Sequence, residues 1–220
     1  MLRGPAFLLI LLCALSAVAE MPHEGTTPTE ICRTVKTGAH ESTPYTLPGF
    51  VDAAERSIDV RFLPNAADYA CGCAVEPVDS CNTSSWNKLW GSSRCGYTHS
   101  HHQDSDRFVW RRAVVAGQIE IATYSYDGGK KPYSPPDPHL LQPFSTLLAT
   151  NVSYQLRMHV GAVNTSFVLG RAGATLETKV NQHANACAKA TMGYKLGFFF
   201  GGQCSAPQPV TACYSEQPKQ

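Results

Sequence analysis

Residues 107–126 carry the pattern that most constrains this chain, because two classes of side chain alternate on either side of a short break. The break at Val114–Gly117 predicts a turn, and its flanks predict the two strands of an antiparallel hairpin. Pairing the strands across this turn places three pairs on one face: Arg111 with Glu120, Val109 with Ala122, and Arg107 with Tyr124. The other face is apolar and carries Phe108, Trp110, Ile119 and Ile121. We therefore expect one face to lie in a core and the other to form a polar surface.

Short β-rich segments separated by Gly, Pro, Asn and Asp continue along the chain. The candidate strands are residues 58–63, 107–113, 118–126, 153–160, 165–169, 175–179 and 194–200. Only residues 51–56 and 182–190 hint at short helices, and neither has the periodic apolar face of a core helix. Strands at this spacing, without a βαβ rhythm, predict an all-β fold: a disulfide-stabilised, two-sheet antiparallel jelly-roll sandwich of the concanavalin-like kind.

Residues 1–19 have the layout of a secretory signal peptide: one basic residue, an apolar run from Ala6 to Leu15, and small residues ending at Ala19. That run is too short to span a bilayer. We expect a mature chain that begins at Glu20 and forms a single β-sandwich domain over residues 20–220, with a polar N-terminal lead-in and a short C-terminal tail. We also expect it to be secreted, extracellular or held in a cell wall or matrix, without membrane insertion.

Cysteine usage agrees with an oxidising compartment, because eight of the nine cysteines remain once Cys13 is removed with the signal peptide. The predicted disulfide cysteines are Cys32, Cys71, Cys73, Cys81, Cys95, Cys187, Cys204 and Cys213. The sequence does not fix which of them pair. An alternative is a metal site built on Cys71 and Cys73, although their spacing is not that of a zinc knuckle. Three acceptor triplets predict N-glycosylation at Asn82, Asn151 and Asn164.

Charge excludes some partners, because a formal net charge of +1 supplies no broad electrostatic field for nucleic acid or an anionic membrane. No complete catalytic signature occurs in the sequence, so we assign no catalytic residue, and we expect no cofactor and no metal. The segment with His99, His101, His102, Asp104 and Asp106 could hold a metal if it formed a loop. Packing and hydrogen bonding at the hairpin entrance is the interpretation that we favour for it.

Four blocks of sequence carry a resemblance: Trp86–Gly91, His101–Arg111, Gly117–Tyr126 and Tyr194–Gly202, with Ala206 and Pro207 after them. Their order resembles a group of secreted or lipid-anchored bacterial β-sandwich proteins that has the pattern His-His-x-x-Ser-x-Arg-Phe-x-Trp-Arg and a closing Tyr-Phe-Gly-Gly…Ala-Pro segment. This resemblance covers roughly residues 35–210. It implies a β-sandwich and no established activity.

More distantly, the layout resembles the concanavalin-like jelly rolls, which include alginate-type polysaccharide lyases and many sugar-binding domains. Those lyases have a histidine in a Gln-Ile-His strand and a tyrosine in a closing strand. Here the first motif is Gln118-Ile119-Glu120, and Phe198–Phe200 occupies the closing strand. The resemblance therefore implies a chain without the proton-transfer groups of those lyases.

The polar hairpin face is the candidate ligand site. Its predicted ligand-binding residues are Arg107, Arg111, Glu120, Tyr124 and Tyr126, together with His101 from the hairpin entrance. A guanidinium donates bidentate hydrogen bonds, a carboxylate accepts from hydroxyls, and a tyrosine ring stacks on a sugar face, so this set suits a glycan. The alternative is that Arg111 and Glu120 form only a cross-strand ion pair. Trp110 belongs to the apolar face and is expected in the core, whereas Trp86 and Trp90 could cover the core or line a groove.

The sequence thus favours a secreted carbohydrate-binding, lectin-like or matrix-associated glycoprotein whose partners are polysaccharides or glycoprotein glycans. One alternative is a polysaccharide-degrading enzyme, a lyase or a glycoside hydrolase, in which Glu120 acts as acid or base. Another is a structural coat protein without a discrete ligand.

Overall fold

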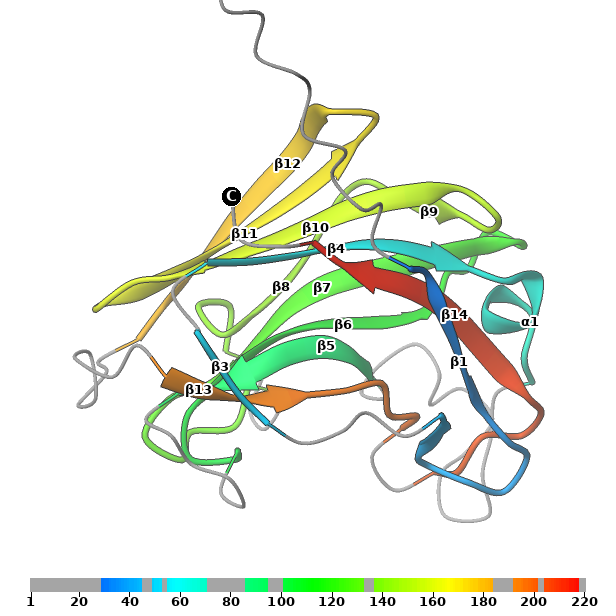
Figure 1. Cartoon of the computed structure of the whole chain (residues 1–220), viewed down its shortest axis with the longest axis horizontal. Coiled ribbons are helices and arrows are strands. Elements are labelled where there is room, and N and C mark those ends of the chain that lie inside the picture. The colour runs from blue at the N-terminus through cyan, green and yellow to red at the C-terminus, as the bar shows by residue number, and fades with distance from the viewer. Residues whose placement is uncertain are drawn as a thin grey trace, which may run out of the picture.

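The computed structural model describes residues 29–44, 49–52, 55–70, 86–94, 101–132, 137–183, 192–201 and 204–217 (Figure 1). Two antiparallel sheets make up this part of the chain. The predicted all-β, two-sheet jelly-roll sandwich is therefore confirmed. Among these residues no helix has the length and hydropathy needed to cross a bilayer.

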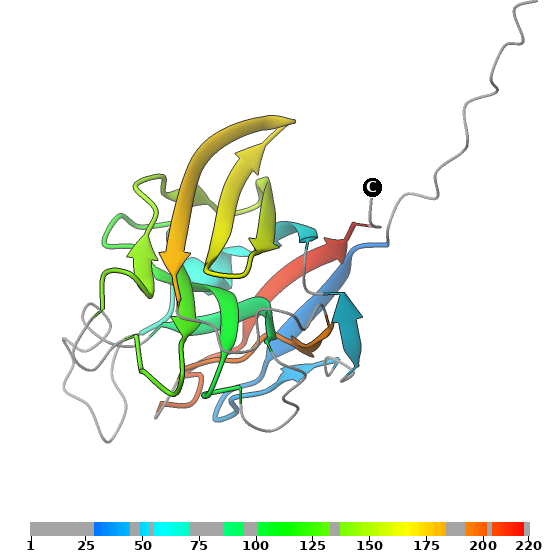
Figure 2. The same cartoon turned by 90° about the vertical axis from the view of Figure 1, so that its left-hand side faces the viewer.

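The first sheet, sheet A, has the strand order β12-β11-β10-β4-β14-β1-β2. Its strands are β1 (Ile31–Val35), β2 (Ser42–Thr43), β4 (Glu55–Phe62), β10 (Ser153–Val160), β11 (Asn164–Arg171), β12 (Ala174–Gln182) and β14 (Val210–Glu216). The β11–β12 hairpin extends beyond the rest of the sandwich in both views (Figures 1 and 2). Strand β14, which the sequence patterns did not reveal, lies between β4 and β1.

The second sheet, sheet B, has the order β3-β13-β5-β6-β7-β8, with β9 also paired to β7. Its strands are β3 (Phe50–Asp52), β5 (Asn87–Ser93), β6 (Ser105–Arg112), β7 (Gln118–Tyr126), β8 (Leu141–Pro143), β9 (Leu148–Ala149) and β13 (Met192–Leu196). A single four-residue helix, α1 (Pro64–Ala67), follows β4 in the described part of the chain. Proline at its first turn suits a helix start, because no intrahelical N–H bond is lost there.

The core lies between the facing sides of the two sheets. Strand β4 alternates strictly, so that Ile58, Val60 and Phe62 are all fully buried from sheet A. Trp110 of sheet B is also fully buried, and its ring lies 5.2 Å from that of Phe62. Full burial of one such large side chain stabilises the fold by about 2–3 kcal/mol. The predicted core position of Trp110 is confirmed.

The two short helices that the sequence suggests are not found among the described residues. Residues 51–56 were expected to form one helical turn, but Val51 and Asp52 belong to β3, and Glu55 and Arg56 belong to β4. This prediction is wrong because the inward alternation of β4 begins at Arg56, and a buried strand outweighs a local helical preference. Of the second candidate, residues 182–190, the first residue ends β12, and residues 184–190 lie outside the described residues.

The predicted disulfides are tested only in part. Cys32 of β1 and Cys213 of β14 are directly opposed and form a disulfide, and Cys204 is also disulfide-bonded. The other five predicted cysteines lie outside the described residues: Cys71, Cys73, Cys81, Cys95 and Cys187. The signal segment 1–19 and Asn82 lie outside them too. Asn151 is exposed in a turn, and Asn164 is half-buried at the start of β11, so their glycosylation stays a prediction.

Candidate functional site

The hairpin of β6 and β7 has the predicted register. Arg107 pairs with Tyr124, Val109 with Ala122 and Arg111 with Glu120. The turn between the strands is closed by a hydrogen bond from the Ala113 amide to the Gln118 carbonyl, at 2.9 Å. Gly117 adopts a φ of 73°, a conformation that costs glycine little. The side chains predicted to share the outer face of sheet B therefore do share it.

At the turn end of this face, Arg111 and Glu120 form a cross-strand ion pair. Arg111 Nε donates to Glu120 Oε2 at 2.6 Å, and the two side chains keep 17% and 22% of their surface exposed. The Arg111 guanidinium also lies over the Trp86 ring, 4.4 Å from its centroid. Since Trp86 itself is buried, its indole supports the arginine rather than offering an open sugar platform.

The expectation that the whole outer face is exposed is wrong. Arg107, Tyr124 and Tyr126 retain only 6%, 2% and 3% of their surface. The two tyrosines belong to a second, smaller apolar cluster with Trp86, Val109 and Ala122, and Leu141 packs against it. Arg107 lies next to this cluster, because it pairs with Tyr124. The physical reason is that Val109 and Ala122 place apolar area at the centre of this face, and the neighbouring aromatic rings bury it.

Arg107 is the most unusual group of the site. Its Nε and Nη2 atoms are buried and have no hydrogen-bond partner among the residues that the structure describes. Desolvation lowers the pKa of this guanidinium to about 10, and the neighbouring Tyr124 and Tyr126 only partly oppose that effect. A buried cation without a hydrogen-bonding anion is costly, and such groups are rare in folded proteins.

Lys88 is a further residue of this site, which sequence reasoning missed. It lies at a register irregularity of β5, and its Nζ donates to the carbonyls of Trp86 and Gly201 at 3.0 and 3.2 Å. The ammonium group also lies over the Tyr124 ring, 5.6 Å from its centroid. Burial and then the charge of Arg107 lower the pKa of Lys88 to about 8. The only signal in the sequence is the position of this lysine between two tryptophans.

His101 and His102 form a turn at the other end of the face. Their Nε2 atoms lie 3.0 Å apart, and the His102 ring lies 5.0 Å from that of Tyr126. Burial, followed by the charges of Arg107, His102 and Lys88, lowers the pKa of His101 to about 3. The pKa of His102 is lowered for the same kinds of reason. Both imidazoles are therefore neutral at physiological pH.

The two aspartates that follow these histidines serve a structural network. Asp104 and Asp106 both accept from Arg94, which is 2% exposed, at distances of 3.2–3.4 Å. Asp106 also accepts from Ser125 Oγ at 2.6 Å and from Thr165 Oγ1 at 2.9 Å. These carboxylates bind a guanidinium and hydroxyl groups, which agrees with the favoured interpretation of hydrogen bonding at the hairpin entrance.

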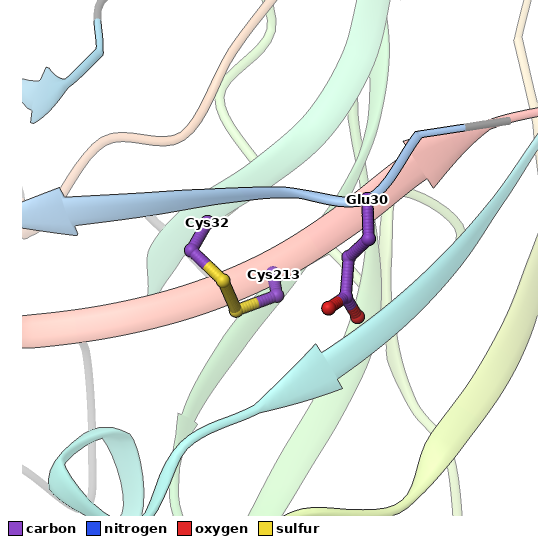
Figure 3. A group of neighbouring side chains, drawn as sticks. All are labelled: Glu30, Cys32 and Cys213. Carbon is purple, nitrogen blue, oxygen red and sulfur yellow. A yellow bond between two sulfur atoms is a disulfide. The ribbon is translucent and has the colours of Figure 1, made fainter.

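Glu30, Cys32 and Cys213 also lie close together (Figure 3). The two sulfur atoms are bonded to each other, so neither is a thiolate ligand. The Glu30 carboxylate accepts two hydrogen bonds from Arg61, at 2.6 and 3.2 Å. This group is therefore a disulfide beside a surface ion pair.

No protein-family model matches the chain, and no curated protein was found to match it. Its strand arrangement is similar to those of several solved structures. One is a functionally unknown protein from Saccharomyces cerevisiae, with 8% identity, a TM-score of 0.43, and coverage of 87% of this chain and 89% of that one. Another is a family 16 glycosyl hydrolase protein from Mycobacterium smegmatis, with 11% identity, a TM-score of 0.41, and coverage of 86% and 75%. A third is the alginate lyase from Klebsiella pneumoniae, with 11% identity, a TM-score of 0.40, and coverage of 74% and 57%. These similarities assign the chain to no family.

Proposed function

We propose that this protein is a secreted carbohydrate-binding protein whose ligand lies along the outer face of the β6–β7 hairpin. The observation that carries the proposal is the half-exposed Arg111–Glu120 pair, which is fixed on the Trp86 ring. A guanidinium and a carboxylate held side by side present donors and acceptors together, which is what vicinal hydroxyl groups require. The Cys32–Cys213 disulfide supports an extracellular location.

Glu120 suits binding better than proton transfer. Its Oε2 atom accepts a hydrogen bond from Arg111 Nε at 2.6 Å. Its Oε1 atom accepts no hydrogen bond from any of the described residues. A carboxylate held by a guanidinium is a fixed acceptor that can meet a sugar hydroxyl. Binding without catalysis is therefore the function that we propose.

The test is polysaccharide binding by the wild-type protein and by Arg111→Ala, with thermal unfolding of both. We expect Arg111→Ala to weaken binding by roughly tenfold or more, because loss of a charge-assisted hydrogen bond costs about 1.5–3 kcal/mol. Its melting temperature should change little, because a partly exposed ion pair contributes only about 1 kcal/mol. Arg61→Ala is the matched control, since Arg61 forms an ion pair with Glu30 at the same 2.6 Å distance on sheet A.

Two outcomes would overturn this proposal. One is equal loss of binding in Arg61→Ala and Arg111→Ala, which would mean that the hairpin face has no special role. The other is release of reducing-end or unsaturated sugars that disappears in Glu120→Gln, which would identify a degrading enzyme instead.

A further inference from the structure

The inner part of the hairpin face gathers nitrogen-bearing side chains. Arg107 is buried, Lys88 and His101 are half-buried, and His102 is exposed. Lys88 lies over the ring of Tyr124, the residue that pairs with Arg107, and the His102 ring lies 5.0 Å from that of Tyr126. The positive charge of Arg107 also lowers the pKa of Lys88 and of both histidines. No carboxylate among the described residues contributes to the pKa shifts of Lys88, His101, His102 or Arg107. These four nitrogen-bearing groups therefore range from exposed to buried, and Arg107 is the buried one.

Arg107 differs from the other described arginines that have a buried nitrogen atom without a partner. Arg33, Arg94 and Arg157 also have a buried nitrogen without a partner. Each of them nevertheless donates elsewhere: Arg33 to the Pro44 carbonyl, Arg94 to two aspartates, and Arg157 to Thr175. Two nitrogen atoms of Arg107 are unsatisfied, and its side chain donates no hydrogen bond to any residue in the described part of the chain.

An anion is the group that would complete this arrangement. A buried guanidinium loses its hydration and regains that energy only from an acceptor, most strongly from a charged one. The fork of Nε and Nη2 matches the two oxygens of a carboxylate or of a sulfate. Lys88 adds a compact positive charge, and a neutral imidazole of His101 can donate one N–H.

We propose that Arg107, with Lys88 and His101, binds an anionic group of the ligand, a carboxylate or a sulfate. This rests on the proposed carbohydrate-binding function and makes the ligand an acidic polysaccharide. Arg107 and Arg111 lie on the same face of β6, four residues and therefore about 13 Å apart. A polymer that places an acidic group at Arg107 can reach the Arg111–Glu120 pair with neighbouring sugar units.

The first experiment measures calorimetric binding to polygalacturonate, to the same polymer with its carboxylates methyl-esterified, and to dextran sulfate. We expect the wild-type protein to bind the free acid roughly 10- to 100-fold more tightly than the ester. Arg107→Met should remove this preference. Arg61→Met, which alters a partly exposed arginine on sheet A, should keep this preference. Binding of dextran sulfate, lost in Arg107→Met, would indicate a sulfate ligand instead of a carboxylate.

The second experiment tests the anion site without a polymer. The melting temperature of the wild-type protein is measured with sodium glucuronate or sodium sulfate against sodium chloride at the same ionic strength. Either anion should raise it, and the rise should be absent in Arg107→Met and reduced in Lys88→Met. Without added anion, Arg107→Met should melt at the wild-type temperature or higher, because it removes an unpaired buried charge. Loss of stability would instead mark Arg107 as a structural residue.

Different results would overturn the anion site and the proposed carbohydrate-binding function. Equal binding of acid and ester, still dependent on Arg111, would overturn the anion site and leave carbohydrate binding intact. A stabilising anion effect that depends on Arg107, without binding of any polysaccharide, would support the anion site and overturn the proposed function. No shift with either anion in the wild-type protein would overturn the anion site.

Discussion

Arg107 and Arg111 belong to one strand and one face, yet their surroundings differ. Arg111 is paired with Glu120 and half-exposed, whereas Arg107 is buried with two unsatisfied nitrogens. His101 and Lys88 also differ from fully exposed residues, because burial and neighbouring positive charges lower the pKa of both side chains. At the residue scale, burial therefore determines which protonation states the site can offer.

The protonation of His101 is a direct prediction. Its imidazole should stay neutral in the folded protein from pH 7 down to about pH 4, because its pKa is lowered from 6.5 to about 3. The unfolded chain takes up that proton near pH 6.5, so the free energy of unfolding should fall as the pH drops below that value. NMR titration of the histidine ring protons checks this, with the protein in denaturant as the reference.

His101→Gln provides the matched comparison for that titration. It should flatten the decrease of stability between pH 7 and pH 5 in urea unfolding, because the replaced imidazole no longer contributes to the linkage. A His101 resonance that titrates near pH 6.5 in the folded protein would contradict the prediction.

Strand β5 lies beside Arg107, and its close packing against β6 depends on one glycine, Gly91. Gly91 pairs with Arg107, and a Cβ atom on Gly91 would lie 2.7 Å from the Arg107 Cα and clash with the Asp106 carbonyl oxygen. Glycine is thus required for β5 to approach β6 this closely. Lys88, earlier on the same strand, reaches the Tyr124 ring from beside the register irregularity.

We predict that Gly91→Ala destabilises the protein by about 1–3 kcal/mol, because the backbone of β6 must move to admit the methyl group. Urea unfolding measures this loss. Gly49→Ala is the control, since a Cβ atom there meets nothing within 4 Å, and it should change stability by less than about 1 kcal/mol. Equal effects of the two substitutions would show that the close approach is not rigid.

On the scale of the whole molecule, a buried polar network joins the two sheets beside the apolar core. Asp106 of β6 accepts from Thr165 of β11, and Asn181 of β12 donates to Ser125 of β7 at 2.7 Å. Arg94 completes the network through Asp106 at 3.2 Å. The network thus fixes how sheet A sits on sheet B near the entrance of the hairpin.

Asp106→Ala should therefore destabilise the protein by about 3–5 kcal/mol, because it leaves part of a buried guanidinium network uncompensated. Denaturant unfolding, together with near-ultraviolet circular dichroism, measures both the stability and the packing of the sandwich. Asp68→Ala, at an exposed position after α1, is the control and should lie within about 0.5 kcal/mol of the wild type. A loss below about 1 kcal/mol in Asp106→Ala would mean that the network is not needed to join the sheets.

The sequence determined the strand alternation, the turn at Gly117 and the pairing of Arg111 with Glu120, because each depends on the period of two and on nearby residues. It also identified Trp110 as a core residue, since its face of the hairpin is uniformly apolar. Only the tertiary structure decided that Tyr124 and Arg107 are buried and that Lys88 lies beside them. Burial of the second face depends on strands far apart in the chain, and local periodicity carries no information about which of them come together.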